Sequence, residues 1–259
     1  EAIILSFYKA NLKEHIWIGL ANYANLLNDS IFWLELKNTL IFVAFLVPGC
    51  ITLALIISVI ISKLPKFMQS FFRGAFYLPF VSAGVVTSMV WMWIFNPSFG
   101  LLNYLLSLIH IKPIIWLGQP NPARFAVMVV VLTWLIGTHI IIYLSALGAI
   151  PKSIYEAAEI DGASSYQKFF KITIPLVMPT TIYLSITITI GIFQICDAIF
   201  LLTGGGPMYS TTSIAYRIYQ LGFMYFRFGE ASTQGVVLLV IVFIASFLQF
   251  KYLNRKLEF

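Results

Sequence analysis

The sequence predicts an all-α polytopic membrane protein, and three observations support that prediction. Of its 259 residues, 60% are hydrophobic and only 10% are charged, with a mean hydropathy of +0.91. A soluble domain carries about 25% charged residues, so this chain has too few to cover a surface in water. Its apolar residues also gather into uncharged runs of about 20 residues or more, which is long enough to cross a ~30 Å hydrocarbon layer as a helix. Transmembrane β-strands would be shorter, at about 10 residues, and would alternate in polarity.

The elements follow in chain order from an N-terminal segment without a start methionine or signal-peptide pattern. Residues 1–12 predict the end of a first helix whose beginning is absent, and residues 11–37 predict an external loop or a short surface helix. Five complete spans are expected after it: Thr39–Ser62, Gly74–Phe95, Phe125–Ile150, Ile172–Cys196 and Ala231–Phe250. We divide the chain into residues 1–36, a membrane domain over 37–253, and a cytoplasmic tail over 254–259.

A polar segment, residues 151–175, separates the third and fourth predicted spans. Ser153 precedes Glu156 by three residues, and Ser164 precedes Gln167 by three, so each pair has the spacing of a helix capping box. The Asp161-Gly162 pair between them is a good helix stop. The segment is therefore expected to form two short helices joined by a turn, outside the membrane.

The basic residues suggest which side of the membrane this segment occupies. One set of loops holds Lys63, Lys66, Arg73, Lys152, Lys168, Lys171, Lys251, Arg255 and Lys256. The opposite loops hold Lys9, Lys13, Lys37, Lys112, Arg124, Arg217 and Arg227. The first set lies closer to the ends of the spans, where positive charge favours the cytoplasm. We expect residues 151–175 and the C-terminus to be cytoplasmic, and residues 96–122 and 202–230 to be external.

Several motifs resemble those of permease subunits in binding-protein-dependent ABC importers. Glu156–Ala158, then Gly162, then Ile172–Pro175 matches the EAA motif of that family, except that Ile174 stands where the family has Leu. Leu202–Pro207 with Ser210–Thr212 is similar to the carbohydrate branch, typified by the maltose and glycerol-3-phosphate permeases. Further similar stretches are Gly19–Tyr23, Asn38–Thr39 and Trp91–Pro97. The resemblance covers about residues 5–249.

The resemblance implies a fold, partners and a coupling site. The fold would be the type I importer transmembrane domain, in the bacterial cytoplasmic (inner) membrane. The partners would be a second permease subunit, cytoplasmic ATP-binding subunits that hold the ATP and Mg, an extracytoplasmic solute-binding protein and the sugar. The residues contacting the ATPase would lie in coupling helices over 151–172, namely Glu156, Ala157, Ala158, Asp161 and Gly162. Whether Glu156 caps its own helix or pairs with a cation of the ATPase stays open.

The resemblance also implies a sugar site on the spans. It assigns Thr138, His139 and Gln194 to the site, and Asp197 is a candidate because ionisable groups at membrane depth are costly and commonly functional. Gln194 and Asp197 are three residues apart and would share a face of one helix. Aromatic candidates for packing on the sugar ring are Trp134, Tyr143 and Phe193. The alternative for each polar candidate is a purely structural role.

Other functions find less support in the sequence. Gly204–Pro207 lacks the Lys and Ser/Thr of a phosphate-binding loop and is expected to be a flexible hinge after the fourth of these spans. No cofactor, metal or nucleic acid is expected to bind this chain, and no group of residues has the pattern of a catalytic site. The remaining alternatives are an importer of the same fold for glycerol-3-phosphate or a polyamine, an ATP-independent carrier or channel, and a membrane-embedded enzyme.

Overall fold

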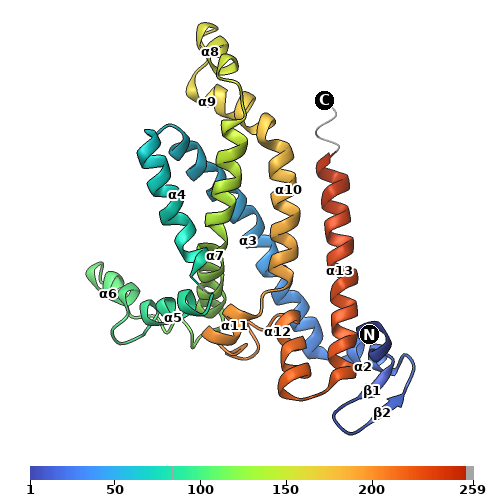
Figure 1. Cartoon of the computed structure of the whole chain (residues 1–259). Helices are drawn as coiled ribbons and strands as arrows, with labels where there is room; N and C mark the ends of the chain where they lie inside the picture. The colour runs from blue at the N-terminus through green and yellow to red at the C-terminus, as the bar shows by residue number, and fades with distance from the viewer. Residues whose placement is uncertain (83, 255–259) are drawn as a thin grey trace.

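A computed structural model describes residues 1–82 and 84–254 (Figure 1). Most of these residues are helical. Four helices are long and apolar enough to cross a membrane: α3 (Ser30–Ser62), α7 (Pro120–Gly148), the continuous stretch Ser165–Phe193 and α13 (Phe228–Asn254). The prediction of a polytopic all-α protein is confirmed, and all four helices begin before the apolar runs that predicted them.

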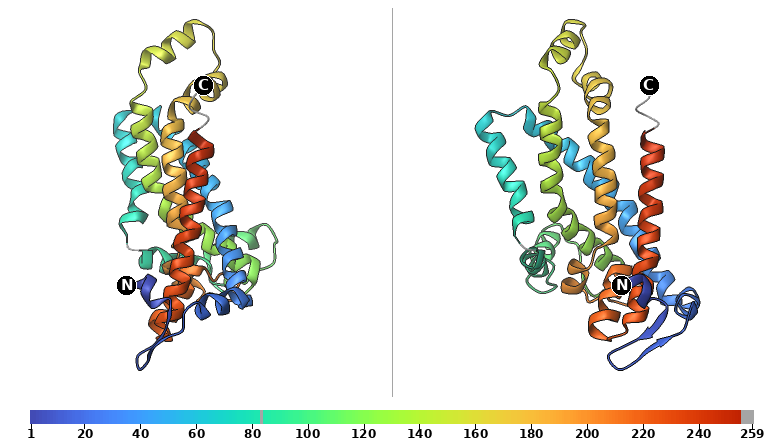
Figure 2. Two further views of the ribbon diagram at one scale, coloured as in Figure 1. Left: turned by 90° about the vertical axis from the view of Figure 1, so that its right-hand side faces the viewer. Right: turned by 45° about the vertical axis from the view of Figure 1, so that its right-hand side comes forward.

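The predicted span Gly74–Phe95 is not one straight helix. Helix α4 (Lys66–Val81) and helix α5 (Gly84–Ile94) meet at 95° on either side of residue 83, which lies outside the described residues. The run holds Pro79, Ser82 and Gly84, residue types that occur at helix kinks, but the uncharged length of the run alone predicted a single span. The break places α5 across the end of α4 instead of extending it, as Figure 2 shows.

The N-terminal segment differs from the helix end predicted for residues 1–12. Only α1 (Ala2–Leu5) is helical, and strands β1 (Tyr8–Ala10) and β2 (His15–Trp17) follow as an antiparallel pair. The Asn11 side chain accepts hydrogen bonds from the backbone of Lys13 and Glu14, both at 2.8 Å, and closes the turn between them. Such local bonds favour turns over helices. Helix α2 (Ala21–Asn28) is the expected short surface helix.

The main core lies between α3, α7 and α10 (Ile174–Phe193), and α4 packs on the far side of α7. Small residues allow close approach there. A Cβ placed on Gly137 of α7 would lie 2.8 Å from the carbonyl carbon of Phe76 and 3.1 Å from the Cα of Tyr77, both in α4. Glycine at such a contact lets two membrane helices pack backbone to backbone.

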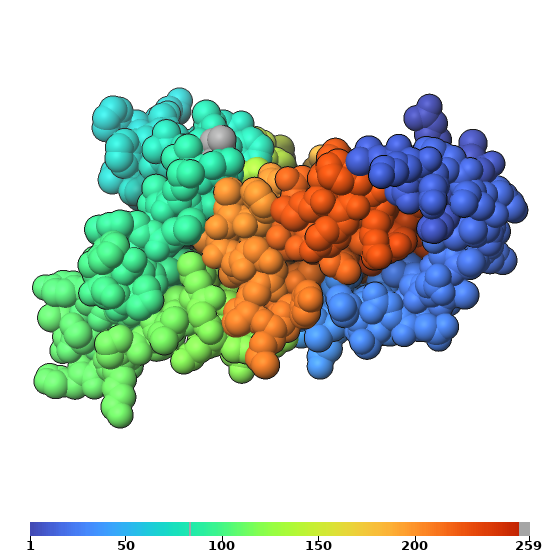
Figure 3. All heavy atoms as spheres, turned by 90° about the horizontal axis from the view of Figure 1, so that it is seen from below, coloured from blue at the N-terminus to red at the C-terminus, as the bar shows by residue number. Residues whose placement is uncertain are grey.

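The bundle has two unlike ends (Figures 1 and 2). At the hairpin end, α8 (Lys152–Ile160) and α9 (Ser165–Lys168) project beyond the spans, and α9 continues through η1 (Phe169–Thr173) into α10. The opposite end carries the N-terminal segment, α5, α6 (Leu101–Leu108), α11 (Asp197–Leu202), α12 (Ile214–Tyr219) and η2 (Gln220–Met224). Figure 3 views that end, where the α11–α12 segment lies between the N-terminal segment and α5–α6.

The glycine-rich segment before α12 is a hydrogen-bonded turn in the structure. Gly204 and Gly205 have φ values of +58° and +85°, a region that glycine enters without a steric penalty. The Thr212 hydroxyl donates a hydrogen bond to the Gly205 carbonyl at 2.9 Å, and the hydroxyls of Thr203 and Thr211 are hydrogen-bonded to each other at 2.7 Å. The expected flexible hinge is therefore a turn closed by its own threonines.

A buried polar cluster ties this turn region to the spans. The side chain of Glu35 on α3 is fully buried, and its Oε1 lies 3.6 Å from Nε of Arg217 on α12. Gln234 of α13 donates to Glu35 Oε2 at 3.4 Å. Asn38 of α3 donates to the Tyr209 carbonyl at 2.7 Å. Glu35 was predicted to lie in an external loop or a short surface helix, because the apolar run counted as a span began only at residue 39.

Candidate functional site

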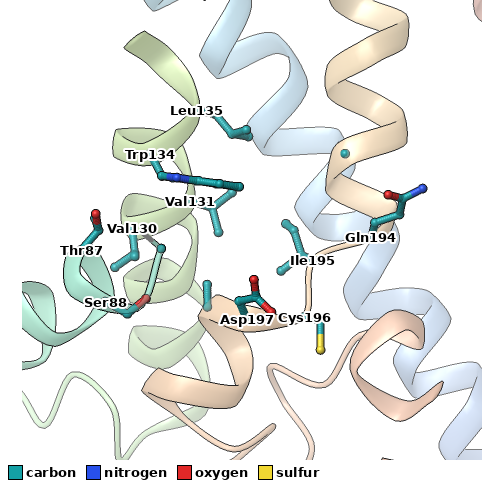
Figure 4. A pocket seen from close by; sticks show the side chains of 13 residues that line it. Thr87, Ser88, Val130, Val131, Trp134, Leu135, Gln194, Ile195, Cys196 and Asp197 are labelled. Atoms are coloured by element: carbon teal, nitrogen blue, oxygen red, sulfur yellow. The ribbon is translucent and has the colours of Figure 1, made fainter. Parts of the chain in front are cut away.

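A cavity of about 290 Å³ lies between α5, α7 and the segment joining α10 to α11 (Figure 4). That volume is close to the lower limit of the ~300–1,000 Å³ usual for small-molecule sites. The lining residues are Gly84, Thr87, Ser88, Val130, Val131, Trp134, Leu135, Gly191, Gln194, Ile195, Cys196, Asp197 and Ala198.

The cavity lies where two apolar runs are interrupted. On one side, α4 gives way to α5. On the other, α10 ends at Phe193 and α11 begins at Asp197. The break frees the Ile195 carbonyl, and Ser213 donates its hydroxyl to it at 2.6 Å. Because lipid offers no hydrogen bonds, irregular backbone at membrane depth is stable only with such internal partners.

Two of the four predicted site residues, Gln194 and Asp197, line the cavity, but they do not share a helix face as expected. Gln194 is the C-terminal cap of α10, and Asp197 is the first residue of α11. In Figure 4 the Asp197 carboxylate points into the cavity toward the ring of Trp134, whereas the Gln194 amide points to the other side of its ribbon. Asp197 is therefore the better placed of the two for contact with a solute in this conformation.

The other two predicted residues, Thr138 and His139, do not line this cavity. His139 is 8% exposed, and its Nδ1 lies 2.7 Å from the Leu135 carbonyl in the preceding turn of α7. The Thr138 hydroxyl is buried without a hydrogen-bond partner among the described residues. Both lie further along α7 toward the hairpin end than Trp134. Their contact with a solute stays a prediction.

Of the aromatic candidates, only Trp134 lines the cavity. Tyr143 is fully buried in the core and donates its hydroxyl to Thr181 at 2.9 Å, and Phe193 is 1% exposed in a second apolar cluster. Helical periodicity alone could not show which of these rings lines a cavity and which are buried in the core, because all three lie on apolar runs. Phe80 of α4 stacks on Trp134 with ring centroids 5.9 Å apart, which holds the indole in place.

Two hydroxyl residues of α5, Thr87 and Ser88, also line the cavity, and they were not predicted from the sequence. A Thr-Ser pair inside an otherwise apolar run was the available signal. The cavity thus combines two hydroxyl residues, a carboxylate and an indole with aliphatic walls, and none of the described residues that line it is Lys or Arg. This chemistry suits a neutral, hydroxyl-rich solute with an apolar face.

The hairpin of α8 and α9 has the predicted turn. Gly162 has a φ of +74°, and its N–H donates to the Glu159 carbonyl at 3.0 Å. The N–H of Ala163 donates to the Ala158 carbonyl at 2.8 Å. These two bonds form a Schellman motif, which requires a left-handed residue where Gly162 lies.

Only one of the two predicted capping boxes forms. Ser164 and Gln167 exchange the expected bonds, at 3.2 and 2.8 Å. Ser153 does not cap α8, because the helix already begins at Lys152 after Pro151 and Ser153 is inside its first turn. Glu156 is exposed and makes no capping bond in this structure.

Side-chain contacts hold the hairpin together. Lys168 of α9 lies 2.7 Å from the Glu159 carboxylate of α8, and Tyr155 and Thr173 join their hydroxyls at 3.0 Å. The hydrogen bond and positive charge from Lys168 lower the pKa of Glu159 below its usual 4.5. The opposite surface of α8 remains open: Glu156, Ala157, Asp161 and Gly162 are exposed, as is Ile160 at 87%, while Ala158 is half-buried.

Within the described residues, no three His, Cys, Asp or Glu side chains gather in an arrangement that could hold a metal ion. The two cysteines, Cys50 and Cys196, are both free.

Comparison with known proteins gives consistent matches over nearly the whole chain. The lactose transport system permease protein LacF of Rhizobium radiobacter is 38% identical over 257 residues, covering 96% of this chain and 85% of that protein. The sn-glycerol-3-phosphate transport system permease protein UgpA of Agrobacterium fabrum is 30% identical, covering 98% of this chain and 88% of that protein.

Solved structures agree with this relationship. A chain from the crystal structure of a bacterial ABC transporter involved in import of the acidic polysaccharide alginate matches with a TM-score of 0.85 and 25% identity, over 98% of this chain and 88% of that one. Residues 38–259 match the family model described as the binding-protein-dependent transport system inner membrane component. The chain belongs to this family of inner-membrane transport permeases.

Proposed function

We propose that this chain is a permease subunit of a bacterial ABC importer that moves a sugar or oligosaccharide across the cytoplasmic membrane. The observation that carries the proposal is the cavity at the two helix breaks. It presents the Trp134 ring, the hydroxyls of Thr87 and Ser88 and the carboxylate of Asp197 to one space. Sugars offer hydroxyl groups and apolar ring faces, and these groups match both. The names of the lactose and alginate relatives point the same way.

A phosphorylated solute such as glycerol-3-phosphate is the second candidate, supported by the name of one relative. Binding a phosphate group ordinarily requires Arg, Lys or an array of backbone N–H groups. The described cavity lining has no Lys or Arg, and Asp197 would repel an anion. The chemistry of the cavity therefore favours the neutral sugar.

The hairpin is the proposed contact for the ATP-binding subunits. Its small and exposed residues Ala157 and Gly162 let a partner surface approach closely, and the exposed Ile160 offers that surface an apolar contact. The exposed Glu156 carboxylate, free of any capping bond, is available for a cation of the ATPase. On this proposal the hairpin end faces the cytoplasm, and the opposite end faces the solute-binding protein and lies beside the second permease subunit.

The proposal is tested with the complete transporter in proteoliposomes, supplied with its solute-binding protein and a panel of labelled sugars. We expect ATP-dependent uptake of at least one sugar. Replacing Asp197 by Asn should reduce uptake about ten- to hundredfold, the range for losing a charged hydrogen bond to the solute. Asp197 is exposed to the cavity and has no side-chain hydrogen bond among the described residues, so the variant should assemble normally.

Trp134→Leu should also reduce uptake, since it removes the ring from the cavity, and Trp93→Leu is the matched control. Trp93 is 57% exposed and does not line the cavity. Equal uptake by wild type and both cavity variants would contradict the assigned site. Uptake of glycerol-3-phosphate but of no sugar would select the second candidate, and uptake without ATP would reject the importer class.

A further inference from the structure

A second cavity, of about 430 Å³, lies at the hairpin end. It is enclosed by α8 and the start of the α9–η1–α10 stretch on one side and by the ends of α3, α4 and α7 on the other. Its lining residues are Val59, Ser62, Lys63, Gln69, Arg73, Leu144, Leu147, Gly148, Ile150, Lys152, Tyr155, Glu159, Ser165, Lys168, Phe169 and Thr173.

The polar part of this cavity is strongly cationic. Four basic side chains line it, and the one carboxylate, Glu159, is already paired with Lys168 at 2.7 Å. The other three, Lys63, Arg73 and Lys152, have no carboxylate partner within the described part of the chain. Three positive charges therefore face a common space without compensation. The three side chains are exposed, and an anion placed between them would be attracted by all three charges.

The turn that carries Lys63 is held in place. Gln69 of α4 donates its side-chain amide to the carbonyls of Ser62 and Leu64, at 3.1 and 2.9 Å. These bonds fix the α3–α4 connection against the start of α4. The backbone that carries Lys63 is therefore held in place relative to Arg73 of α4. Lys152 approaches from the hairpin, on the other side of the cavity.

The remaining wall of the cavity is apolar. It is formed by Val59 of α3, Leu144 and Leu147 of α7, Ile150 just after α7, and Phe169 of η1. These residues lie at the ends of helices that cross the membrane, so the wall leads from the basic residues toward the hydrocarbon layer. A cavity with a cationic mouth and an apolar wall at that depth is complementary to an amphipathic anion.

The face of α8 that lines this cavity differs from the face proposed to contact the ATPase. Lys152, Tyr155 and Glu159 line the cavity at helical spacing, three and four residues apart. Neither Glu156 nor Ala157 lines the cavity. Ala157 lies on the other side of this helix, and Glu156 lies at the edge of the cavity-lining face, one turn from Lys152. A ligand in the cavity and a protein on the outer face could therefore be bound together.

We propose that this cavity binds an anionic phospholipid, with the headgroup phosphate between Lys63, Arg73 and Lys152 and an acyl chain along the apolar wall. The Arg73 guanidinium can hold two phosphate oxygens at once, while the two lysines supply point charges. Basic pockets between the ends of membrane helices are a general mode of recognising anionic headgroups. The apolar wall favours a lipid over free phosphate, which would leave that wall in contact with water.

Lipid binding is measured by native mass spectrometry on the full chain in its purified, delipidated transport complex. Phosphatidylglycerol and phosphatidylcholine with the same acyl chains are added separately. We expect tighter retention of phosphatidylglycerol. The double variant Lys63→Gln/Arg73→Gln should weaken that retention roughly 25-fold, about fivefold for each cation lost. Both residues lie outside the hairpin and the sugar cavity, so this result is independent of ATP coupling and of the solute.

The matched control is Lys66→Gln/Lys171→Gln, which removes two exposed cations from the same end without touching the cavity lining. It should change retention by less than about twofold. Equal losses in the two double variants, or equal retention of the two lipids by the wild type, would overturn the proposal. Displacement of bound phosphatidylglycerol by millimolar inorganic phosphate would also overturn it and would assign the cavity to free phosphate.

Discussion

Replacing Gly137 by Ala tests whether the contact between α4 and α7 depends on the absence of one methyl group. The added Cβ would lie closest to the carbonyl oxygen of Phe76 and 2.8 Å from its carbonyl carbon, whereas ordinary van der Waals contacts begin at 3.4 Å. The two helices must therefore separate by at least 0.6 Å along that contact. The obstacle is backbone, so no side-chain rotation can relieve it.

The cost follows from two opposing effects. Overpacking a close contact costs about 1–3 kcal/mol, while Ala in place of Gly within a helix gains up to about 1 kcal/mol. We expect a net loss of about 1–2 kcal/mol. For a chain of this size that corresponds to a melting temperature lower by about 2–8 °C. The displacement would also disturb the stacking of Phe80 on Trp134, so sugar uptake should fall together with stability.

Thermal unfolding of the purified complex in detergent measures the effect, with Gly49→Ala as the control. Gly49 lies within α3, another spanning helix, and a Cβ there meets no atom within 4 Å. That variant should melt at or slightly above the wild-type temperature. If Gly137→Ala behaves in the same way, the close approach of α4 and α7 is not the arrangement of the native protein.

Three further predictions concern charge and backbone conformation. Arg217→Met leaves the buried Glu35 carboxylate unpaired and should lower the free energy of unfolding by about 3–5 kcal/mol; adding Glu35→Gln should restore most of it. Gly162→Val should uncouple ATP hydrolysis from uptake, because its φ of +74° costs a β-branched residue about 1–2 kcal/mol or more, whereas Gly162→Asn should stay largely coupled. Lys168 lowers the pKa of Glu159 below its usual 4.5, so the pair stabilises the hairpin fully above pH 4.5 and is lost as the pH falls through the lowered pKa. The distribution of distances between spin labels on α8 and α9 should therefore broaden as the pH is lowered through that range.

Each of these has a result that would count against it. An Arg217→Met variant as stable as the wild type would show that Glu35 is not confined in a dry environment. Equal coupling in the Val and Asn variants of Gly162 would remove backbone conformation as the cause. The Glu159→Gln variant should give a broad distribution of spin-label distances at every pH. If its distribution is still narrow at neutral pH, the salt bridge does not hold the hairpin together.

The spans and the hairpin could be predicted because they depend on local or one-dimensional features. An uncharged run of sufficient length must be helical in lipid, whatever it packs against. The end of α8 at Gly162 could be predicted because the hydrogen bonds that end the helix are all made by neighbouring residues. The predicted Ser153 capping box was wrong for an equally local reason, since Pro151 is the N-cap and the helix begins two residues too early for Ser153 to cap it.

The bend between α4 and α5 and the unwound Gln194–Cys196 segment could not be predicted, because both depend on distant partners. The carbonyl freed at Ile195 is satisfied by Ser213, 18 residues later, and Thr87 of α5 donates to the Pro79 carbonyl of α4 at 3.3 Å. Without these partners the backbone of an apolar run would continue as a helix. Pro79, Ser82 and Gly84 make a kink in the first run possible, but they do not predict a bend of 95°.

The same dependence explains why polar residues in the spans were hard to sort into binding and structural groups. A polar side chain in a continuous helix can bond to the carbonyl one turn earlier, as His139 does with Leu135, and needs no other partner. At a break, the side chain has no such turn beside it and points into the space that the break opens, as Asp197 does. Residue type and hydropathy are alike in the two cases. What separates them is the interruption of the helix. On the proposed sugar site, contact with the solute would therefore depend on where a polar side chain lies at the break and which way it points, more than on its residue type.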